Sequence, residues 1–337
     1  MMKLRIKKLL EEGRTEVKTK HQLEKFPLGS LISYVSKEGQ FRRGGTIIKF
    51  ADEYFIYLSY DGKTKVRARY INISKIWVKI NTTFTLTFGD QAENNVGMKK
   101  IGVMAKCGFN YDDLIKAKCW FESKGIVATI YDLSKQIRKD QPKLKFEDAY
   151  LLIASNGLSA ICNPRDFYKE QESLRKDTKA LIRGRVVNKR ARYNLCFDDV
   201  AIDPDYENGQ GTVVAFKDVP LLESVRNTLP DILGEKAVDL KCEGNYYTDI
   251  SRKSGISYHG DAERKLVIGV RVGASMPLRF QWFYKTNAIG SYMNYILNDG
   301  DLYFSSSKAV GTDWKLRNTP TLRHCAGCNK YLQIKKK

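Results

Sequence analysis

A histidine and an aspartate two residues apart, His259 and Asp261, are the pair in this chain whose types and spacing most directly suggest chemistry. Side chains alternate along an extended segment, so residues i and i+2 point to the same face. An imidazole and a carboxylate placed this way supply two ligands of a 2-His-1-carboxylate site, which holds non-haem Fe(II) and leaves positions open for substrate and oxygen. The motif is short, and a turn with a solvated histidine would show the same pattern.

Candidates for a third ligand are few. The sequence contains three histidines, of which only His324 lies in the same region as His259. Cys325 and Cys328 form a single CxxC pair, and one such pair without a second is a weak indication of zinc. The seven cysteines are scattered and odd in number, which is typical of reduced thiols in an intracellular protein.

The residues flanking the histidine–aspartate pair form a longer pattern. GNYYTDISRKSGISYHGDAERKLVIGVRVG contains an Asn-x-Tyr strand, the HxD motif, an acidic residue and an apolar strand that ends in glycine. Further along, NDGDLYFS contains a Gly-Asp pair, and RNTPTLRHCAG contains two arginines six residues apart. In this order, these elements resemble the core of the AlkB-like 2-oxoglutarate/Fe(II)-dependent dioxygenases. The resemblance covers residues 145–337, slightly over half of the chain.

This resemblance implies a double-stranded β-helix (jelly-roll) domain that uses Fe(II) and 2-oxoglutarate. His259 and Asp261 would be catalytic as iron ligands, together with His324. Arginine suits the distal carboxylate of 2-oxoglutarate, because its planar guanidinium meets a carboxylate in bidentate fashion. The residues expected to bind the cosubstrate are Asn245, Tyr247, Arg317 and Arg323.

One feature departs from the family pattern. In AlkB-like enzymes the second histidine lies upstream of both arginines, whereas here His324 directly follows Arg323. On a regular strand these two side chains point to opposite faces. Three arrangements stay open: His324 binds iron and Arg317, Lys308 or another cation binds the cosubstrate; Arg323 faces inward and Asp313 or water completes the site; or the iron site is lost.

The charge of the chain suggests its partner. There are 58 lysines and arginines against 38 acidic residues, a formal net charge of +20, which favours nucleic acid, either DNA or RNA. No apolar run approaches the length of a membrane span, so we expect no membrane partner. The segment RGRVVNKRARYNLCFDD resembles the loop with which these enzymes cover a nucleic-acid substrate. The residues expected to bind the substrate are Lys189, Arg190, Arg192, Tyr193 and, as a platform for a flipped base, Trp282.

The rest of the chain predicts an α+β protein of several parts. Short alternating runs before residue 80, with a hairpin signal at Asp61-Gly62, indicate a small β-barrel of the SH3 or Tudor type that could also bind a protein partner. The expected division is a basic arm over 1–26, the small barrel over 27–90, a short α/β unit over 91–144 and the dioxygenase-like domain over 145–337.

The function favoured by these features is oxidation of a base in nucleic acid, by demethylation or hydroxylation. Two alternatives remain: a non-catalytic basic structural or nucleic-acid-binding protein with a degenerate dioxygenase fold, such as a virion component, and a protein hydroxylase. The compact layout suggests a large DNA virus or its host. We expect the protein in the cytoplasm or nucleus, or in the virion if it is viral.

Overall fold

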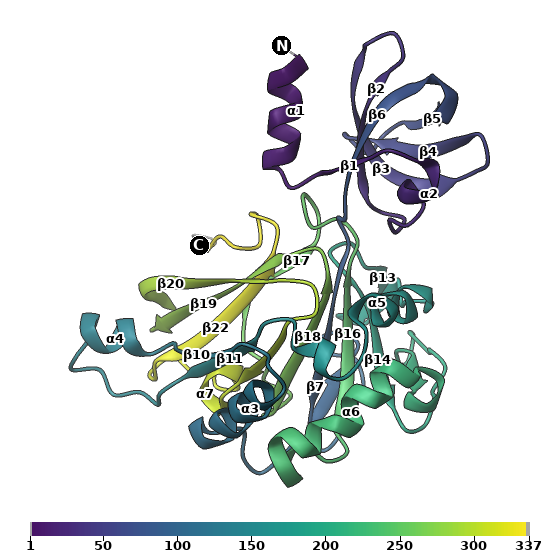
Figure 1. Cartoon of the computed structure of the whole chain (residues 1–337). Coiled ribbons are helices and arrows are strands. Elements are labelled where there is room, and N and C mark those ends of the chain that lie inside the picture. The colour runs from purple at the N-terminus through teal and green to yellow at the C-terminus, as the bar shows by residue number, and fades with distance from the viewer. Residues whose placement is uncertain (1, 335–337) are drawn as a thin grey trace. The chain divides into compact units, whose positions relative to one another are not determined.

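The computed structural model describes residues 2–334 and divides the chain into two compact units, residues 1–82 and 83–337. Both units combine helices with a larger share of strands, which confirms the expected α+β class (Figure 1). The first unit is much the smaller of the two, and the histidine–aspartate motif lies in the second.

The first unit contains a single six-stranded antiparallel sheet in the order β1-β6-β2-β3-β4-β5. The predicted hairpin at Asp61-Gly62 is confirmed, since it joins β4 to β5 and Gly62 adopts a φ of 75°. Within the described residues β1 and β5 are not paired, so the sheet is not closed into the expected barrel. The elements are α1 (Met2–Glu11), β1 (Thr15–Val17), α2 (Lys20–Leu23), β2 (Leu31–Ser36), β3 (Phe41–Phe50), β4 (Tyr54–Ser59), β5 (Lys65–Arg69), η1 (Tyr70–Asn72) and β6 (Ile73–Lys79).

The second unit is built on an eight-stranded sheet in the order β10-β11-β21-β18-β7-β16-β14-β15. Neighbouring strands are antiparallel except β14 and β15. The strand that begins the unit, β7, lies at the centre of the sheet between β18 and β16. Its strands are β7 (Thr83–Gly89), β10 (Ala128–Asp132), β11 (Tyr150–Ala154), β14 (Tyr193–Asp198), β15 (Val213–Ala215), β16 (Lys241–Tyr247), β18 (Val267–Gly273) and β21 (Leu302–Ser305).

Helices cover one face of this large sheet (Figure 1). Alternate residues of the central strands, such as Leu86, Val270 and Phe304, are fully buried in the core beneath the helices. The helix over residues 111–123 begins with a capping box in which the Asn110 side chain accepts from Asp113 N at 2.9 Å. The covering helices are α3 (Tyr111–Ser123), α5 (Pro164–Ser173) and α6 (Pro220–Leu233).

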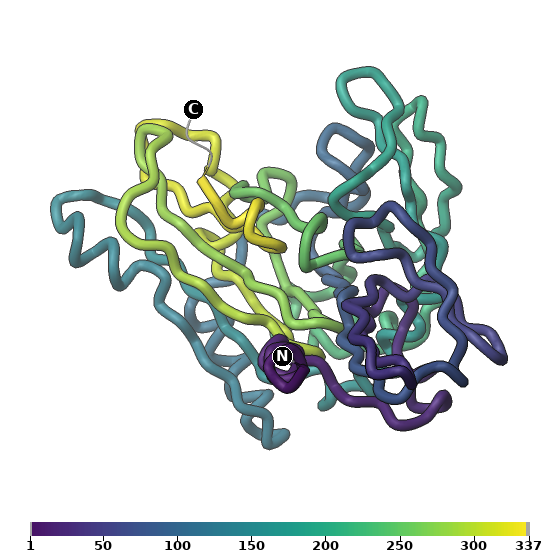
Figure 2. The backbone as a smooth tube through the Cα atoms, turned by 90° about the horizontal axis from the view of Figure 1, so that it is seen from above, coloured from purple at the N-terminus to yellow at the C-terminus, as the bar shows by residue number. Residues whose placement is uncertain are grey.

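A second, four-stranded sheet in the order β17-β22-β19-β20 faces the uncovered side of the large sheet. Its light-green and yellow strands run side by side in Figure 2. Its strands are β17 (Gly255–His259), β19 (Met276–Tyr284), β20 (Asn287–Leu297) and β22 (Thr321–Gly327). The remaining elements are β8 (Gln91–Glu93), β9 (Lys100–Gly102), α4 (Lys135–Asp140), η2 (Gly157–Ala160), β12 (Lys179–Ile182), β13 (Arg185–Asn188), η3 (Phe216–Asp218), η4 (Gly234–Ala237) and α7 (Ser307–Val310).

The division of the chain differs from the expected one. Residues 83–90 were assigned to the small barrel and residues 91–144 to a separate unit, but both segments belong to the same unit as residues 145–337. The reason lies in β7, where Phe84, Leu86 and Phe88 alternate with threonines. The strands before β7 show the same alternation of apolar and polar residues. The pattern therefore predicts a strand correctly but does not show which sheet that strand joins.

Trp282 is a core residue and not the expected substrate platform. Its side chain is 2% exposed, and it packs on Phe146 with ring centroids 5.2 Å apart. The indole Nε1 donates to the Leu133 carbonyl at 2.8 Å. Side chains alternate along β19, and at this position the side chain points into the space between the two sheets.

Replacing Trp282 with phenylalanine is therefore expected to lower the free energy of unfolding by about 1–3 kcal/mol, because the buried Leu133 carbonyl loses its donor. Urea denaturation measures this effect. Trp120→Phe is the control, since Trp120 is only half-buried on α3, and it should cost less than about 1 kcal/mol. A Trp282→Phe protein of unchanged stability would contradict the core role.

Candidate metal centre

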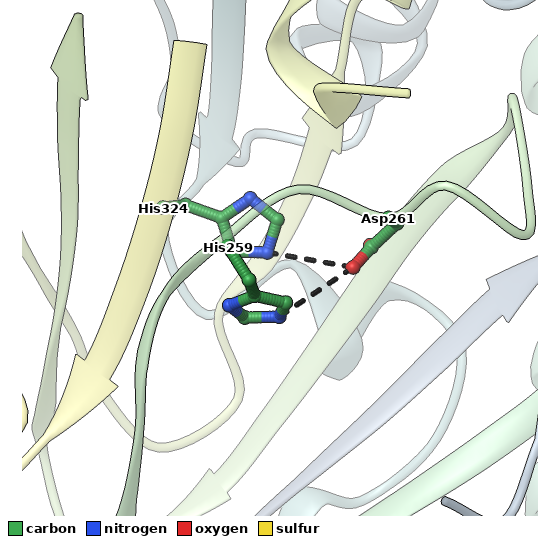
Figure 3. A group of neighbouring side chains, drawn as sticks. All are labelled: His259, Asp261 and His324. Carbon is green, nitrogen blue, oxygen red and sulfur yellow. Dashed lines mark ion pairs between the residues drawn. The ribbon is translucent and has the colours of Figure 1, made fainter. Parts of the chain in front are cut away.

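Two histidines and one aspartate converge in the second unit (Figure 3). His259 ends β17, Asp261 follows two residues later, and His324 lies at the middle of β22. The Oδ1 atom of Asp261 is 3.6 Å from His259 Nε2 and 3.7 Å from His324 Nε2. One ligand atom from each of the three residues lies within 4.8 Å of the others, which is the arrangement that a shared metal ion requires.

Strand pairing produces this convergence. His259 and His324 are direct partners in the antiparallel pairing of β17 with β22, and their ring centroids are 4.4 Å apart. Along β22, His324 shares its face with the buried Leu322, whereas Arg323 points to the other face. His324 therefore has the position that the first of the three arrangements left open by the sequence requires.

Gly260, which lies between His259 and Asp261, allows the backbone there to pass close to the backbone of Gly311. A Cβ atom on Gly260 would lie 2.1 Å from the Gly311 carbonyl oxygen. The next residue is held at the same place, since the backbone N–H of Asp261 donates to the Val310 carbonyl at 3.0 Å. The segment after β17 is therefore fixed against α7, and the Asp261 carboxylate is fixed with it.

His259 and His324 are in the neutral form, which can bind a cation. His259 Nδ1 lies 2.8 Å from the Ser257 carbonyl, and donation there leaves the Nε2 lone pair directed at Asp261. Burial lowers the pKa of His259 to about 4, reinforced by His324, and burial with the nearby Arg264 charge lowers the pKa of His324 to about 4. Both rings are thus neutral at pH 7, the form that binds metals.

The three ligand groups do not satisfy one another. Separations of 3.6 and 3.7 Å are longer than hydrogen bonds, and the Nε2 lone pair of neutral His259 faces a carboxylate oxygen across one of them. A divalent cation between the three atoms would satisfy all of them. The donor set of two nitrogens and one oxygen therefore fits a metal such as Fe(II), and imidazole and carboxylate are ligands typical of that ion.

The three candidate ligands open into a cavity of about 360 Å³ whose floor is the uncovered face of the large sheet. Asn245 pairs with Thr85, and Thr85 pairs with Arg271, so three polar side chains form one row across β16, β7 and β18. Directly opposite side chains on neighbouring strands lie within contact of one another. This row places an amide, a hydroxyl and a guanidinium in the same cavity as the three ligands.

Arg271 is a buried cation that forms no ion pair with any of residues 2–334. Its side chain is 1% exposed, its Nε has no hydrogen-bond partner, and its Nη1 donates only to the weak acceptor Met276 Sδ at 3.8 Å. Burial lowers its pKa. The hydroxyl of Thr85 beside it is also buried without a partner. Buried charges and polar groups normally have partners, so this part of the cavity is suited to a small anion.

A second buried arginine supports the wall beside Asp261. Arg264 forms ion pairs with Glu243 and with Glu263, the latter at 2.9 Å, and its positive charge is felt by Asp261. Burial nevertheless raises the pKa of Asp261. Asn245 extends the network, because its Nδ2 donates to Glu243 Oε1 at 2.9 Å. Arg264 is thus neutralised by its own carboxylates, in contrast to Arg271.

Several residues predicted from the sequence do line the cavity: His259, Asp261, His324, Asn245, Tyr247 and Arg192. The amide of Asn245 is largely engaged, since its Oδ1 accepts from Arg192 Nε at 2.6 Å and from Asn194 Nδ2 at 2.9 Å. Asn245 therefore positions Arg192 at the cavity wall. Tyr247 is buried at the end of the same strand.

The two arginines expected to bind the cosubstrate lie elsewhere. Arg317 is exposed, and it contributes its carbonyl to a turn by accepting from Lys285 N at 3.0 Å. The Arg323 guanidinium lies 4.2 Å from the centre of the Phe283 ring, on the face of β22 opposite His324. The alternative cation Lys308 is also excluded, because its Nζ is 2.5 Å from Asp313 and 2.8 Å from the Pro320 carbonyl.

Two of the residues expected to bind the substrate, Lys189 and Tyr193, instead make contacts within the protein. Lys189 is half-buried, and its Nζ donates to Asn94 Oδ1 at 2.5 Å and to Asn194 Oδ1 at 2.8 Å. Burial lowers its pKa to about 8. Tyr193 packs against the core of the large sheet. Arg190 remains exposed beside them, so it alone of the three is free to meet a ligand from solvent.

Arg271 and Thr85 were not predicted as site residues. A signal for Arg271 was present, since it is the one charged residue in the apolar run VIGVRVG, where a buried arginine needs a reason. Thr85 had no comparable signal. It lies 160 residues before its cross-strand partner Asn245, and its pairing depends on β7 entering the centre of the large sheet.

Comparisons with known proteins place the chain among viral proteins. It is 43% identical over 257 residues to uncharacterized protein R156 of Acanthamoeba polyphaga mimivirus, a match that covers 76% of this chain and 99% of the relative. The chain belongs to the family of that protein. No family model matches the sequence.

Shorter segments of the chain are also similar to other proteins of the same virus. Protein L7 is 54% identical over 69 residues, covering 20% of this chain and 44% of the relative, and protein L6 is 45% identical over 71 residues, covering 21% and 33%. Both are also uncharacterized proteins. These relatives are consistent with the expected viral origin. Among residues 2–334, no helix has the length and apolar character needed to cross a membrane.

The centre makes a direct prediction about metal binding. His324→Ala should weaken the binding of Fe(II) or Co(II), measured anaerobically by calorimetry, by more than about 100-fold, because it removes one of three ligands and even supporting residues are worth about 10–100-fold. Arg323→Ala is the matched control, since it changes the adjacent residue on the opposite face, and its metal affinity should match the wild type. Equal affinities in both variants would exclude His324 as a ligand.

Proposed function

We propose that the second unit is an Fe(II)- and 2-oxoglutarate-dependent dioxygenase with a double-stranded β-helix fold, and that it oxidises a base in nucleic acid by demethylation or hydroxylation. One observation carries the proposal: two imidazoles and a carboxylate meet in a cavity that also contains an unpaired buried arginine. The resemblance of residues 145–337 to AlkB-like enzymes supports it independently.

His259, Asp261 and His324 would hold the iron. When bound, Fe(II) supplies the oxidation chemistry in which 2-oxoglutarate and oxygen are consumed. The ligand residues occupy one side of the site, which leaves the cavity side open. The network of Arg264, Glu243 and Glu263 would keep the neighbouring wall rigid, so that Asp261 stays directed at the metal.

Arg271 is proposed to bind the distal carboxylate of 2-oxoglutarate. In AlkB-like enzymes an arginine strand follows the strand of the second histidine, but β22 is the last strand in residues 2–334. The position of the cation must therefore change, and Arg271 reaches the same cavity from β18. A guanidinium can meet a carboxylate through two N–H groups, and Thr85 can donate its unpartnered hydroxyl to the same anion.

The aromatic platform for the substrate is proposed to be Trp314 in place of Trp282. Trp314 lines the cavity next to the metal ligands, because a Cβ atom on Gly260 would lie 2.8 Å from its Cβ. Its indole N–H is buried without a partner. Lys315 and Arg192 also line the cavity and could contact the phosphates beside a flipped base.

The unpaired Arg271 favours an enzyme over a non-catalytic protein with a degenerate site, because a site without a cosubstrate would gain nothing from a buried guanidinium that lacks an anion. A protein hydroxylase would use the same metal and cosubstrate. Only the substrate separates it from the proposed function, so the test includes peptide and oligonucleotide arms.

Arg271→Gln is expected to raise the Kd for 2-oxoglutarate by at least about 30-fold, because truncating one partner of a buried charge pair costs about 2 kcal/mol or more. The measurement is anaerobic titration of the Fe(II)-loaded protein with 2-oxoglutarate, followed by the weak visible absorption band. Arg317→Gln removes an exposed arginine from the same unit and should leave the Kd unchanged.

Turnover then distinguishes the substrate classes. Succinate formation by the wild-type protein should be stimulated by methylated oligonucleotides and not by peptides. Stimulation by peptides alone would favour the protein hydroxylase. A wild-type protein that binds Fe(II) but shows neither an absorption band nor succinate would contradict the dioxygenase assignment.

A further inference from the structure

The first unit has a concentrated positive charge that the metal centre does not explain. Residues 1–82 contain 18 lysines and arginines and 8 acidic residues, a formal net charge of +10. Half of the chain's net charge of +20 therefore lies in a quarter of its length. Charge of this density indicates a polyanionic partner for this unit by itself.

Strand register gathers part of this charge on one face of β3, β4 and β5. Phe55 and Tyr57 of β4 point into the core, so Tyr54, Ile56 and Leu58 point to the opposite face. The cross-strand partners of these outward residues on β5 are Arg69, Arg67 and Lys65, and Lys49 on β3 is paired with Ile56. We call Lys49, Lys65, Arg67 and Arg69 the basic face; all four side chains are exposed.

The basic face is not neutralised by the protein. The ion pairs of the first unit involve Arg14 and Lys20, and in residues 2–82 none of them includes a member of the basic face. The central carbon of the Arg67 guanidinium lies over the Tyr54 ring, 3.6 Å from its centre. This contact orients the guanidinium, which lowers the entropy lost when it binds an anion.

We propose that the basic face binds the phosphate backbone of nucleic acid. Lys65, Arg67 and Arg69 recur at every second residue of β5, so their side chains form a row with a spacing of about 6.6 Å and a length of about 13 Å. A row of cations fits the successive phosphates of a polymer better than one compact anion. Arginine also matches phosphate geometry through its fork of N–H groups.

Other polyanionic partners fit this face less well. A membrane surface would require apolar side chains that insert between lipids, whereas Ile56 and Leu58 are half-buried between the cations. An acidic protein is the remaining competitor. The proposal does not rest on the dioxygenase function, because the basic face is formed entirely within residues 49–69.

The test compares two triple variants of the full-length protein. K65Q/R67Q/R69Q removes the row on β5, and K139Q/K143Q/K145Q removes three exposed lysines from the second unit. Binding to fluorescently labelled oligothymidylate and to a duplex of the same length is followed by anisotropy over a range of NaCl concentrations. Each phosphate contact contributes about 0.7 to the slope of log K against log salt for single strands, and about 0.9 for duplexes.

K65Q/R67Q/R69Q should lower the magnitude of that slope by about 2 for single strands and should weaken binding at low salt by at least tenfold. K139Q/K143Q/K145Q should retain the wild-type slope. Circular dichroism and Fe(II) affinity test whether both triple variants are folded. The double variant R67K/R69K, which keeps the positive charge, should show the wild-type slope. If both triple variants lose affinity equally, or if K65Q/R67Q/R69Q retains the wild-type slope, the proposal is wrong. Preferential binding of the basic face to a polyglutamate peptide would also overturn it.

Discussion

The antiparallel pairing of β17 with β22 is the constraint on which the candidate site depends. It joins residues 65 positions apart in the chain and sets His259 directly opposite His324. The close approach of Gly260 to Gly311 then brings Asp261 to the same point. A shift of one residue in the register would turn His324 to the opposite face and bring Arg323 into the cavity.

The large sheet serves two purposes because its two faces differ. One face is apolar and buried beneath helices, and it stabilises the unit through close packing. The other face presents a row of polar side chains to the cavity, including Arg271. The sheet can hold a buried, unpaired guanidinium there because many apolar contacts on the helical face offset its desolvation. In the proposed enzyme, a rigid floor would fix 2-oxoglutarate relative to His259, Asp261 and His324.

Sequence reasoning located the local features of the site and missed those that depend on distant pairing. His259 and Asp261 share a face because of their spacing, and the Asp61-Gly62 hairpin follows from a local signal. Arg271 could have been found as a lone charge in an apolar strand. By contrast, Trp282 and Lys189 look like surface or ligand-binding residues in sequence. Only the packing of distant segments buries Trp282 and engages Lys189 in hydrogen bonds within the protein.

His259, Asp261 and His324 are proposed to bind one metal ion. The most direct measurement is a crystal structure of the protein loaded anaerobically with Fe(II), with diffraction data collected on both sides of the iron absorption edge. A site formed by these three residues should give one anomalous peak in the second unit, about 2.0–2.3 Å from His259 Nε2, His324 Nε2 and an Asp261 carboxylate oxygen. Iron bound elsewhere, or bound without His324, would contradict it.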